Sequence, residues 1–152
     1  MSAPVRGLAL ALTTAGAVVG LDQGTKAAVN SHVARGDELQ VLPFLELANT
    51  RNRGVAFGLA DDVSPELIAA TLLVLIALLT YLAARVKGPR LIWLPAGLLI
   101  GGALGNLADR VRDGAVIDFI DLPLWATFNL ADVAIVTGVA LLVLVPDRSE
   151  PG

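Results

Sequence analysis

The stretch IDFIDLPLWATFNLADVAIV, residues 117–136, places three acidic residues around the start of a strongly apolar run. They are Asp118, Asp121 and Asp132. Acidic side chains in or beside a membrane-spanning segment are rare because burying them is unfavourable, and those that occur usually face a polar interior and serve a function. We therefore expect a polar site where this segment enters the bilayer.

The composition of the whole chain indicates a membrane protein. Apolar residues make up 55% of its 152 residues and charged residues 16%, against about 45–50% and about 25% in soluble domains. The mean hydropathy is +0.72. The net charge of −3 offers no basic face for nucleic acid. The sequence has no cysteine and a single histidine, His32, in a polar loop. We expect neither a thiolate metal site nor a cysteine nucleophile, and no cofactor.

Four apolar runs are candidates for crossing a bilayer, which takes about 17–25 residues. They cover residues 7–29, 67–84, 91–108 and 128–145. We expect an all-α polytopic membrane protein, with four transmembrane helices in a single domain, 1–152. Asp22 and Lys26 are four residues apart in the first run, a spacing that suits a helix continuing into the interface. Alternatively, the first run is a signal peptide cleaved near Ala15-Gly16-Ala17.

The connections between these runs predict their orientation. The segment RVKGPR, residues 85–90, is basic and has no acid, and such segments favour the cytoplasmic side. We expect cytoplasmic termini and extracytoplasmic loops over 30–64 and 109–127. The 1–2 loop contains LQVLPFLELANTRNRGVAFGLA, residues 39–60, which mixes β-formers with turn residues. This mixture predicts a small β-sheet cradle within the loop, lying on the membrane surface.

A stripe of small residues marks the third run. Glycine recurs every four residues, and the stripe runs through Gly97, Gly101 and Gly105 to Asp109. Small residues at this spacing allow close approach of two helices, so we expect a packing seam. The seam does not explain why Asn106, Asp109 and Arg110 lie at the same helix end. Asp109 and Arg110 could instead be a solvated interfacial pair.

The acidic residues of the opening stretch differ in their surroundings. Asn129 and Asp132 could be the cap and third-position acid of a helix start. Asp118 is flanked by apolar residues, as if a loop or strand tucks against the bundle, whereas Asp121 is more typical of a solvated loop acid. Two carboxylates brought together cannot both ionise readily, so one keeps a proton while the other stays basic. Such a pair can hydrolyse a peptide bond without metal, thiol or histidine.

Five short motifs resemble, in order and spacing, those of the lipoprotein signal peptidases, or bacterial signal peptidase II. They are LDQGTK (21–26), NRGVAFG (52–58), GGALGNLADR (101–110), VIDFID (116–121) and FNLADVAI (128–135). Each alone is a weak signal, but together they cover nearly the whole chain. The resemblance implies an intramembrane aspartyl endopeptidase of the bacterial cytoplasmic (inner) membrane. Such an enzyme removes signal peptides from diacylglyceryl-modified prolipoproteins, cutting before the lipidated cysteine.

The resemblance also implies roles for individual residues. The catalytic dyad falls on Asp118 and Asp132, near the outer membrane face. Substrate contacts fall on Asn52, Gly54, Asn106, Arg110 and Asn129, and structural roles on Asp22, Lys26 and Asp109, with Asp109 beside Arg110. One departure is Val133, where the family often has a small polar residue. We expect replacement of Asn52 or Arg110 to weaken processing without changing its pH profile. The expected partners are lipid-modified prolipoproteins and membrane lipid, not nucleic acid, and we expect a monomer.

Two other classes of function are consistent with parts of this pattern. A proton- or ion-coupled transporter would use buried acids as a relay, but the sequence shows no inverted repeat and its acids cluster toward one membrane face. A structural membrane-assembly protein would explain the glycine stripe but not the acids. Cleavage of a lipidated prolipoprotein by the purified protein separates these alternatives.

Overall fold

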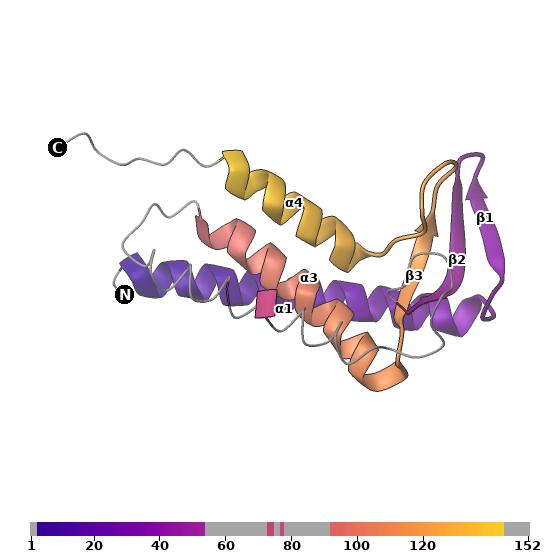
Figure 1. Ribbon diagram of the computed structural model, residues 1–152, viewed down its shortest axis with the longest axis horizontal. Coiled ribbons are helices and arrows are strands. Elements are labelled where there is room, and N and C mark those ends of the chain that lie inside the picture. Colours follow the sequence, from indigo (N-terminus) through magenta and orange to yellow (C-terminus); the bar gives the residue numbers. More distant parts are fainter. Residues whose placement is uncertain (1–2, 54–72, 75–76, 78–91, 145–152) are drawn as a thin grey trace.

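The computed structural model describes residues 3–53, 73–74, 77 and 92–144. Three helices run side by side, and a small sheet crosses one end of them (Figure 1). The helices are α1 (Ala3–His32), α3 (Trp93–Asp113) and α4 (Leu130–Leu144), and the strands are β1 (Glu38–Leu42), β2 (Leu45–Asn52) and β3 (Val116–Asp121). Of the predicted second span, 67–84, all but Leu73, Val74 and Ala77 lie outside the described residues.

The glycine stripe is the seam along which α3 packs. A Cβ atom added at Gly97 would lie 2.6 Å from the backbone oxygen of Ala11, and one at Gly101 would lie 2.8 Å from that of Ala15. Gly102 makes an equally close approach to α4. Because side chains there would hold the backbones apart, glycine allows α3 to lie between α1 and α4. The predicted packing seam is confirmed.

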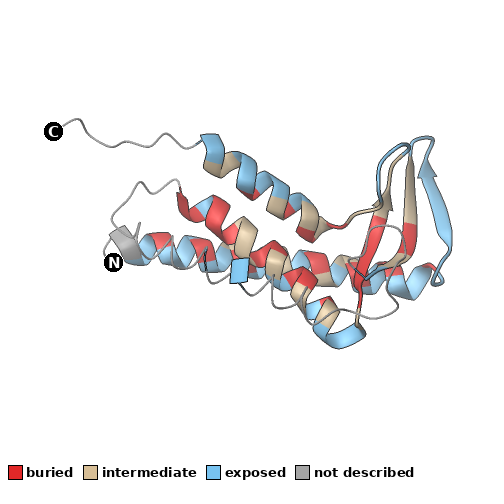
Figure 2. Cartoon of the chain, viewed as in Figure 1, coloured by how far each residue is buried: buried red, intermediate tan, exposed pale blue. Residues whose placement is uncertain are grey.

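The helices extend beyond three of the predicted limits, namely both ends of the first run and the end of the third. Helix α1 is continuous from Ala3 to His32 and contributes buried residues to the bundle (Figure 2). Helix α3 continues to Asp113, past the predicted end at residue 108. It stops at Gly114, which has a left-handed φ of 67° and donates its N–H to the carbonyl of Arg110 at 3.1 Å. Asp109 and Arg110 are therefore helical and do not begin a loop.

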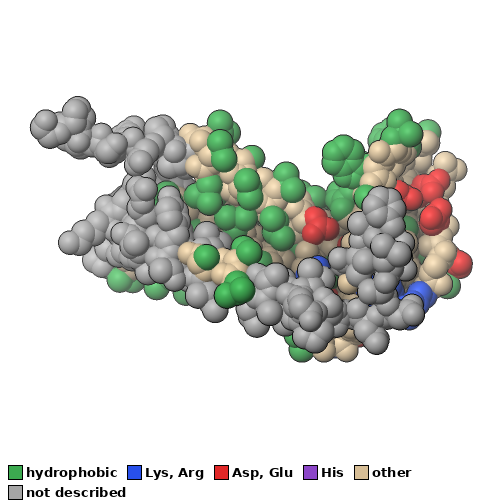
Figure 3. All heavy atoms as spheres, in the orientation of Figure 1, with side chains coloured by type: hydrophobic (Ala, Val, Ile, Leu, Met, Phe, Trp, Pro, Cys, Tyr) green, Lys and Arg blue, Asp and Glu red, His purple; other side chains and the backbone are tan. Residues whose placement is uncertain are grey.

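The surfaces of the helices are compatible with lipid. Within the described ranges, α1 is the helix that is both long and apolar enough to span a bilayer, over Val5–His32, and α4 is a shorter apolar helix. The exposed side chains of α1 include Leu8, Leu12 and Leu21. Hydrophobic side chains also cover the visible face of α4 (Figure 3). The structure thus bears out a mostly helical membrane protein, while the expected count of four spans remains a prediction.

The sheet is antiparallel, in the order β1-β2-β3. The prediction that it lies within the 1–2 loop is wrong for β3, which comes from the connection between α3 and α4. Strand β3 pairs with β2 so that Asp118 is opposite Thr50 and Val116 opposite Asn52. The pairing satisfies backbone groups that an edge of β2 would otherwise leave free. A buried cluster of Val29, Val33 and Phe119 then fixes the sheet on the end of α1.

Candidate active site

Asp118 is a buried acidic residue in the middle of β3. Its side chain is 2% exposed. Two amide groups donate to its oxygens: Nδ2 of Asn129 to Oδ1 at 2.6 Å, and Nδ2 of Asn52 to Oδ2 at 2.9 Å. The expectation that a strand tucks Asp118 against the bundle is confirmed. Asn52 therefore contacts the carboxylate of Asp118 itself. The expectation that replacing Asn52 leaves the pH profile of processing unchanged did not take this contact into account.

Asp132 lies in the first turn of α4 and is partly exposed. Its Oδ1 accepts a hydrogen bond of 2.7 Å from Nδ2 of Asn106. It also forms a reciprocal cap with Asn129: its N–H donates to Oδ1 of Asn129 at 3.0 Å, and its Oδ2 accepts from the Asn129 N–H at 3.3 Å. The capping interpretation is thus confirmed. It is compatible with a role in chemistry, because the cap fixes where the carboxylate points.

Asn129 joins the two carboxylates. It is fully buried, and besides its bonds to Asp118 and Asp132 its Nδ2 donates to Oδ1 of Asn106 at 3.1 Å. Asn106 is buried as well. Each asparagine can therefore hold a carboxylate and the other asparagine in one fixed arrangement. Side chains from β3, α3 and α4 meet in a single hydrogen-bonded network.

A buried acid–base–acid triad lies beside this network. Nζ of Lys26 is 2.7 Å from Oδ2 of Asp22 and 2.7 Å from Oδ2 of Asp109. All three side chains are at most 1% exposed. Buried charges are tolerated only when they are paired and hydrogen-bonded. Nζ of Lys26 also donates to Oδ1 of Asn106 at 3.2 Å, which connects the triad to Asp132.

The two acids of the triad, Asp22 and Asp109, accept hydrogen bonds from the backbone next to Asp132 and Asp118. Oδ1 of Asp22 accepts a hydrogen bond of 3.0 Å from the N–H of Ala131, next to Asp132. Oδ2 of Asp109 accepts one of 3.2 Å from the N–H of Ile117, next to Asp118. A single Lys26 cation thus lies between the two groups that position β3 and the start of α4.

Asp109 and Arg110 do not form the solvated pair that the sequence allowed. Asp109 is fully buried and pairs with Lys26 and, at 3.2 Å, with Nη2 of Arg112. Consecutive helical residues point about 100° apart, so Asp109 faces α1 while Arg110 faces elsewhere. Nε of Arg110 is buried without a hydrogen-bond partner within the part of the chain described here. Its Nη1 makes a long bond of 3.5 Å to the carbonyl of Asn106.

Burial raises the pKa of Asp118 to about 6. Loss of hydration is the largest cause, and the nearby Asp132 carboxylate raises it further, while the amides of Asn52 and Asn129 act in the opposite direction. A carboxyl group that keeps its proton to this pH, beside a second carboxylate, is what general acid–base chemistry requires.

Sequence reasoning missed Gln23. Its Nε2 donates to Oδ1 of Asp109 at 2.8 Å and to the carbonyl of Gly105 at 3.2 Å, and its Oε1 accepts from Arg112 at 3.1 Å. Its place in the motif LDQGTK was the available signal. Of the other predicted residues, Gly54 lies outside the described residues. Asp121 is not a loop residue, because it ends β3 and is partly buried.

Among the described residues, one group of side chains could hold a metal ion. Glu38, Glu46 and Asp121 have carboxylate oxygens within 4.8 Å of one another on the sheet. Register explains this grouping, since Glu46 is opposite Asp121 across β2 and β3. Acidic groups of this kind are common without an ion, and within the described ranges none of the three forms a hydrogen bond with the Asp118–Asp132 network.

The fold and the site together define a helical membrane protein with a buried acid-based site at one end of its bundle. The profile of the family described as signal peptidase (SPase) II matches residues 14–146. The chain therefore belongs to the signal peptidase II family of lipoprotein-processing membrane proteases.

Individual relatives agree with this assignment. The chain is 44% identical over 124 residues to the lipoprotein signal peptidase of Pelotomaculum thermopropionicum, covering 80% of this chain and 81% of the relative. It is 40% identical over 130 residues to that of Brucella ovis, covering 82% and 81%. A solved bacterial membrane enzyme, determined in meso at 1.9 Å, superposes with a TM-score of 0.80 at 32% identity, covering 92% of this chain and 94% of that one.

Proposed function

We propose that the chain is an intramembrane aspartyl endopeptidase with Asp118 and Asp132 as its catalytic dyad. It removes signal peptides from diacylglyceryl-modified prolipoproteins by cutting before the lipidated cysteine. The observation that carries the proposal is the meeting of these two carboxylates, from β3 and α4, on one shared asparagine, Asn129. Paired carboxylates of this kind supply both an acid and a base for peptide hydrolysis.

The surroundings of the two groups support different protonation states. Asp118 is the buried member, and its raised pKa favours the protonated form. Asp132 is partly exposed, so water can reach it, and it accepts hydrogen bonds from a side-chain amide and a backbone N–H that fix its orientation. We assign the shared proton of the resting dyad to Asp118.

The chemistry follows from this assignment. Ionised Asp132 removes a proton from a water molecule, and the resulting hydroxide attacks the scissile carbonyl carbon. Asp118 donates its proton to the carbonyl oxygen, so the tetrahedral intermediate is neutral. Its collapse returns a proton to Asp118, breaks the C–N bond and passes the proton on Asp132 to the leaving amine. The dyad then holds one proton again, and the signal peptide has gained a carboxyl terminus.

Substrate handling is divided between two sets of residues. Arg110 is partly exposed, so the accessible part of its permanently charged guanidinium can donate to a peptide carbonyl. Asn52 and Gly54, at and after the end of β2, are proposed to contact the extended peptide. Asn106 and Asn129 are buried and engaged with the dyad, so we propose that they are positioning residues.

We further propose that the termini are cytoplasmic and that the dyad lies near the outer face of the cytoplasmic membrane, in a monomer. The acid-free segment 85–90 supports this orientation. The exposed tip of the sheet, which includes Phe44, Leu124 and Trp125, supports contact with the lipid interface. Figure 3 shows hydrophobic side chains gathered at this tip, across a hollow from α4.

The test is cleavage of a purified lipidated prolipoprotein by the purified enzyme. Asp118→Asn and Asp132→Asn should each abolish formation of the shortened product, because an amide can neither activate water nor exchange the proton. Both variants should still bind substrate, and the double variant should be no worse than either single variant. Asp121→Asn is the matched control, since its carboxylate lies on the same strand and outside the network. Wild-type activity in Asp118→Asn would exclude this dyad, and Asp109 would be examined next.

A further inference from the structure

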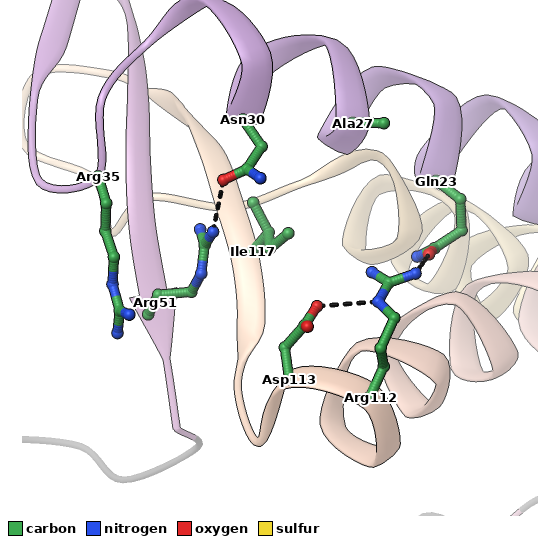
Figure 4. Close-up of a pocket in the computed structure, with 8 residues that line it drawn as sticks. All are labelled: Gln23, Ala27, Asn30, Arg35, Arg51, Arg112, Asp113 and Ile117. Carbon is green, nitrogen blue, oxygen red and sulfur yellow. Dashed lines mark hydrogen bonds and ion pairs between the residues drawn. The ribbon is translucent and has the colours of Figure 1, made fainter.

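A polar cavity lies on the opposite face of β3 from the Asp118 side chain. It has a volume of about 450 Å³, and its lining residues come from α1, the turn after it, β2, α3 and β3 (Figure 4). Ile117 contributes to this cavity, whereas the side chain of its neighbour Asp118 points the other way and contacts Asn129. Successive residues of a strand point to opposite faces, so the two sites share β3 without sharing side chains.

The cavity has three arginines and one acid, and the arginines differ in how they are neutralised. Arg112 is satisfied: its Nε is 2.9 Å from Oδ2 of Asp113, and its Nη2 is 3.2 Å from Oδ1 of Asp109. Arg51 instead donates to neutral groups, including Oδ1 of Asn30 at 2.7 Å. Arg35 makes no hydrogen bond or ion pair with the described residues. Two positive charges therefore face the cavity without an anion directly against them.

The repulsion between these two positive charges is unfavourable. Burial lowers the pKa of Arg51, and the Arg35 charge lowers it further, while Asp113 and Asp109 act in the opposite direction. An anion between Arg35 and Arg51 would remove this repulsion. Guanidinium groups bind phosphate oxygens through two parallel N–H donors, which makes phosphate the anion that best matches two arginines.

The position of the cavity along α1 indicates where such a phosphate comes from. Ala27 of the lining is six residues beyond Leu21, which is 66% exposed on the apolar part of the helix. At 1.5 Å per residue this is about 9 Å. The polar layer on each side of a bilayer is about 5–8 Å thick. The lining begins closer, at Gln23, which is two residues or about 3 Å beyond Leu21. A bilayer whose apolar layer ends at Leu21 would therefore place the near side of the cavity among the lipid headgroups.

We propose that this cavity binds the phosphate of an anionic ligand between Arg35 and Arg51, and that a phosphatidylglycerol-type headgroup of the adjoining leaflet is its source. The site is independent of the proposed peptidase chemistry. The anion site is connected to the peptidase site through β2. Thr50 and Asn52, on either side of Arg51, donate hydrogen bonds to Asp118 at 3.0 and 2.9 Å. An anion held by Arg51 stabilises the strand that holds Asp118.

Calorimetric titration of the purified full-length protein in a neutral detergent tests the proposal. Water-soluble dihexanoyl phosphatidylglycerol should bind saturably, whereas dihexanoyl phosphatidylcholine, which has no net charge, should not. Arg35→Gln and Arg51→Gln should each weaken binding about tenfold, the loss expected from one charge-assisted hydrogen-bonding partner. Arg51→Lys keeps the charge but loses the planar fork, and should also weaken binding. Arg6→Gln, at the other end of α1, is the matched control and should bind normally.

The other outcomes are equally decisive. Glycerol 1-phosphate binding as tightly as the lipid, with the same dependence on Arg35, would support the phosphate site with a soluble source. Equal binding of phosphatidylcholine, or equal weakening by Arg6→Gln, would overturn the site. Binding of an acidic peptide but not of phosphatidylglycerol would overturn it in favour of a protein partner. Arg35 is exposed, so Arg35→Gln keeps the test valid even where Arg51→Gln disturbs β2.

Discussion

Replacing Asn52 by alanine removes one of the two amides that hold Asp118. In the structure Nδ2 of Asn52 donates to Oδ2 of Asp118 at 2.9 Å. This bond stabilises the carboxylate and opposes the effect of burial, which raises the pKa of Asp118 to about 6. A hydrogen bond to a charged group contributes about 1.5 kcal/mol, and one pKa unit corresponds to about 1.36 kcal/mol. Because Asn52 is exposed, water replaces part of this bond, and the expected rise is about half to one unit.

The sign of the effect on activity follows from the proposed mechanism. A higher pKa keeps the proton on Asp118 to higher pH, so the singly protonated dyad persists further into the alkaline range. The alkaline limb of kcat/KM, which reports the free enzyme, should therefore move upward in Asn52→Ala. The measurement is kcat/KM for a lipidated prolipopeptide across the range in which Asp118 titrates.

Thr50→Val is the matched control for this experiment. Oγ1 of Thr50 donates to the backbone oxygen of Asp118 at 3.0 Å and not to its carboxylate. Its loss should disturb the same strand pairing while leaving the alkaline limb in place. An Asn52→Ala limb that coincides with wild type, or that moves to lower pH, would refute the reasoning that this amide stabilises the ionised form of the acid.

Three further predictions concern the scaffold. Lys26→Met leaves the buried Asp22 carboxylate without its cation and Asp109 with Arg112 alone, and should destabilise the protein by about 3–5 kcal/mol in detergent unfolding experiments. Adding Asp22→Asn should recover part of the loss, and no recovery would contradict the triad. Gly101→Ala places a Cβ 2.8 Å from a backbone oxygen of α1, so unfolding should show a loss of about 1–3 kcal/mol. For topology, Gly88→Cys and Asp61→Cys, both outside the described residues, are compared in whole cells with a membrane-impermeant thiol reagent. The Asp61 variant should label and the Gly88 variant should not; the reverse pattern contradicts cytoplasmic termini.

Local patterns in the sequence predicted the parts of the site that depend on helix geometry. The Asp22–Lys26 pair is separated by four residues and forms at 2.7 Å, and the Asn129–Asp132 cap is separated by three. The glycine stripe of α3 likewise follows from helical periodicity alone. In each case the spacing of a regular helix brings the residues together, whatever the rest of the chain does.

The interactions that the sequence did not reveal join residues far apart in the chain. Lys26 and Asn106 are separated by 80 positions, Asn52 and Asp118 by 66, and Asp22 and Ala131 by 109. The pairing of Asp109 with Lys26, and not with Arg110, depends on which face of α3 meets α1. Side-chain direction decides that choice, and adjacency in the sequence does not.

The sequence by itself determined that the chain enters a membrane, that its polar residues form an ordered set of motifs, and that two carboxylates are available for chemistry. Composition and short-range periodicity determine these features, because apolar runs and helical spacing act locally. Only the tertiary structure decided that β3 joins the sheet of the 1–2 loop, that Asn52 touches Asp118, and that Arg35 and Arg51 face one cavity. These depend on strand register and helix packing, in which the backbone groups and charges of distant segments must be satisfied together.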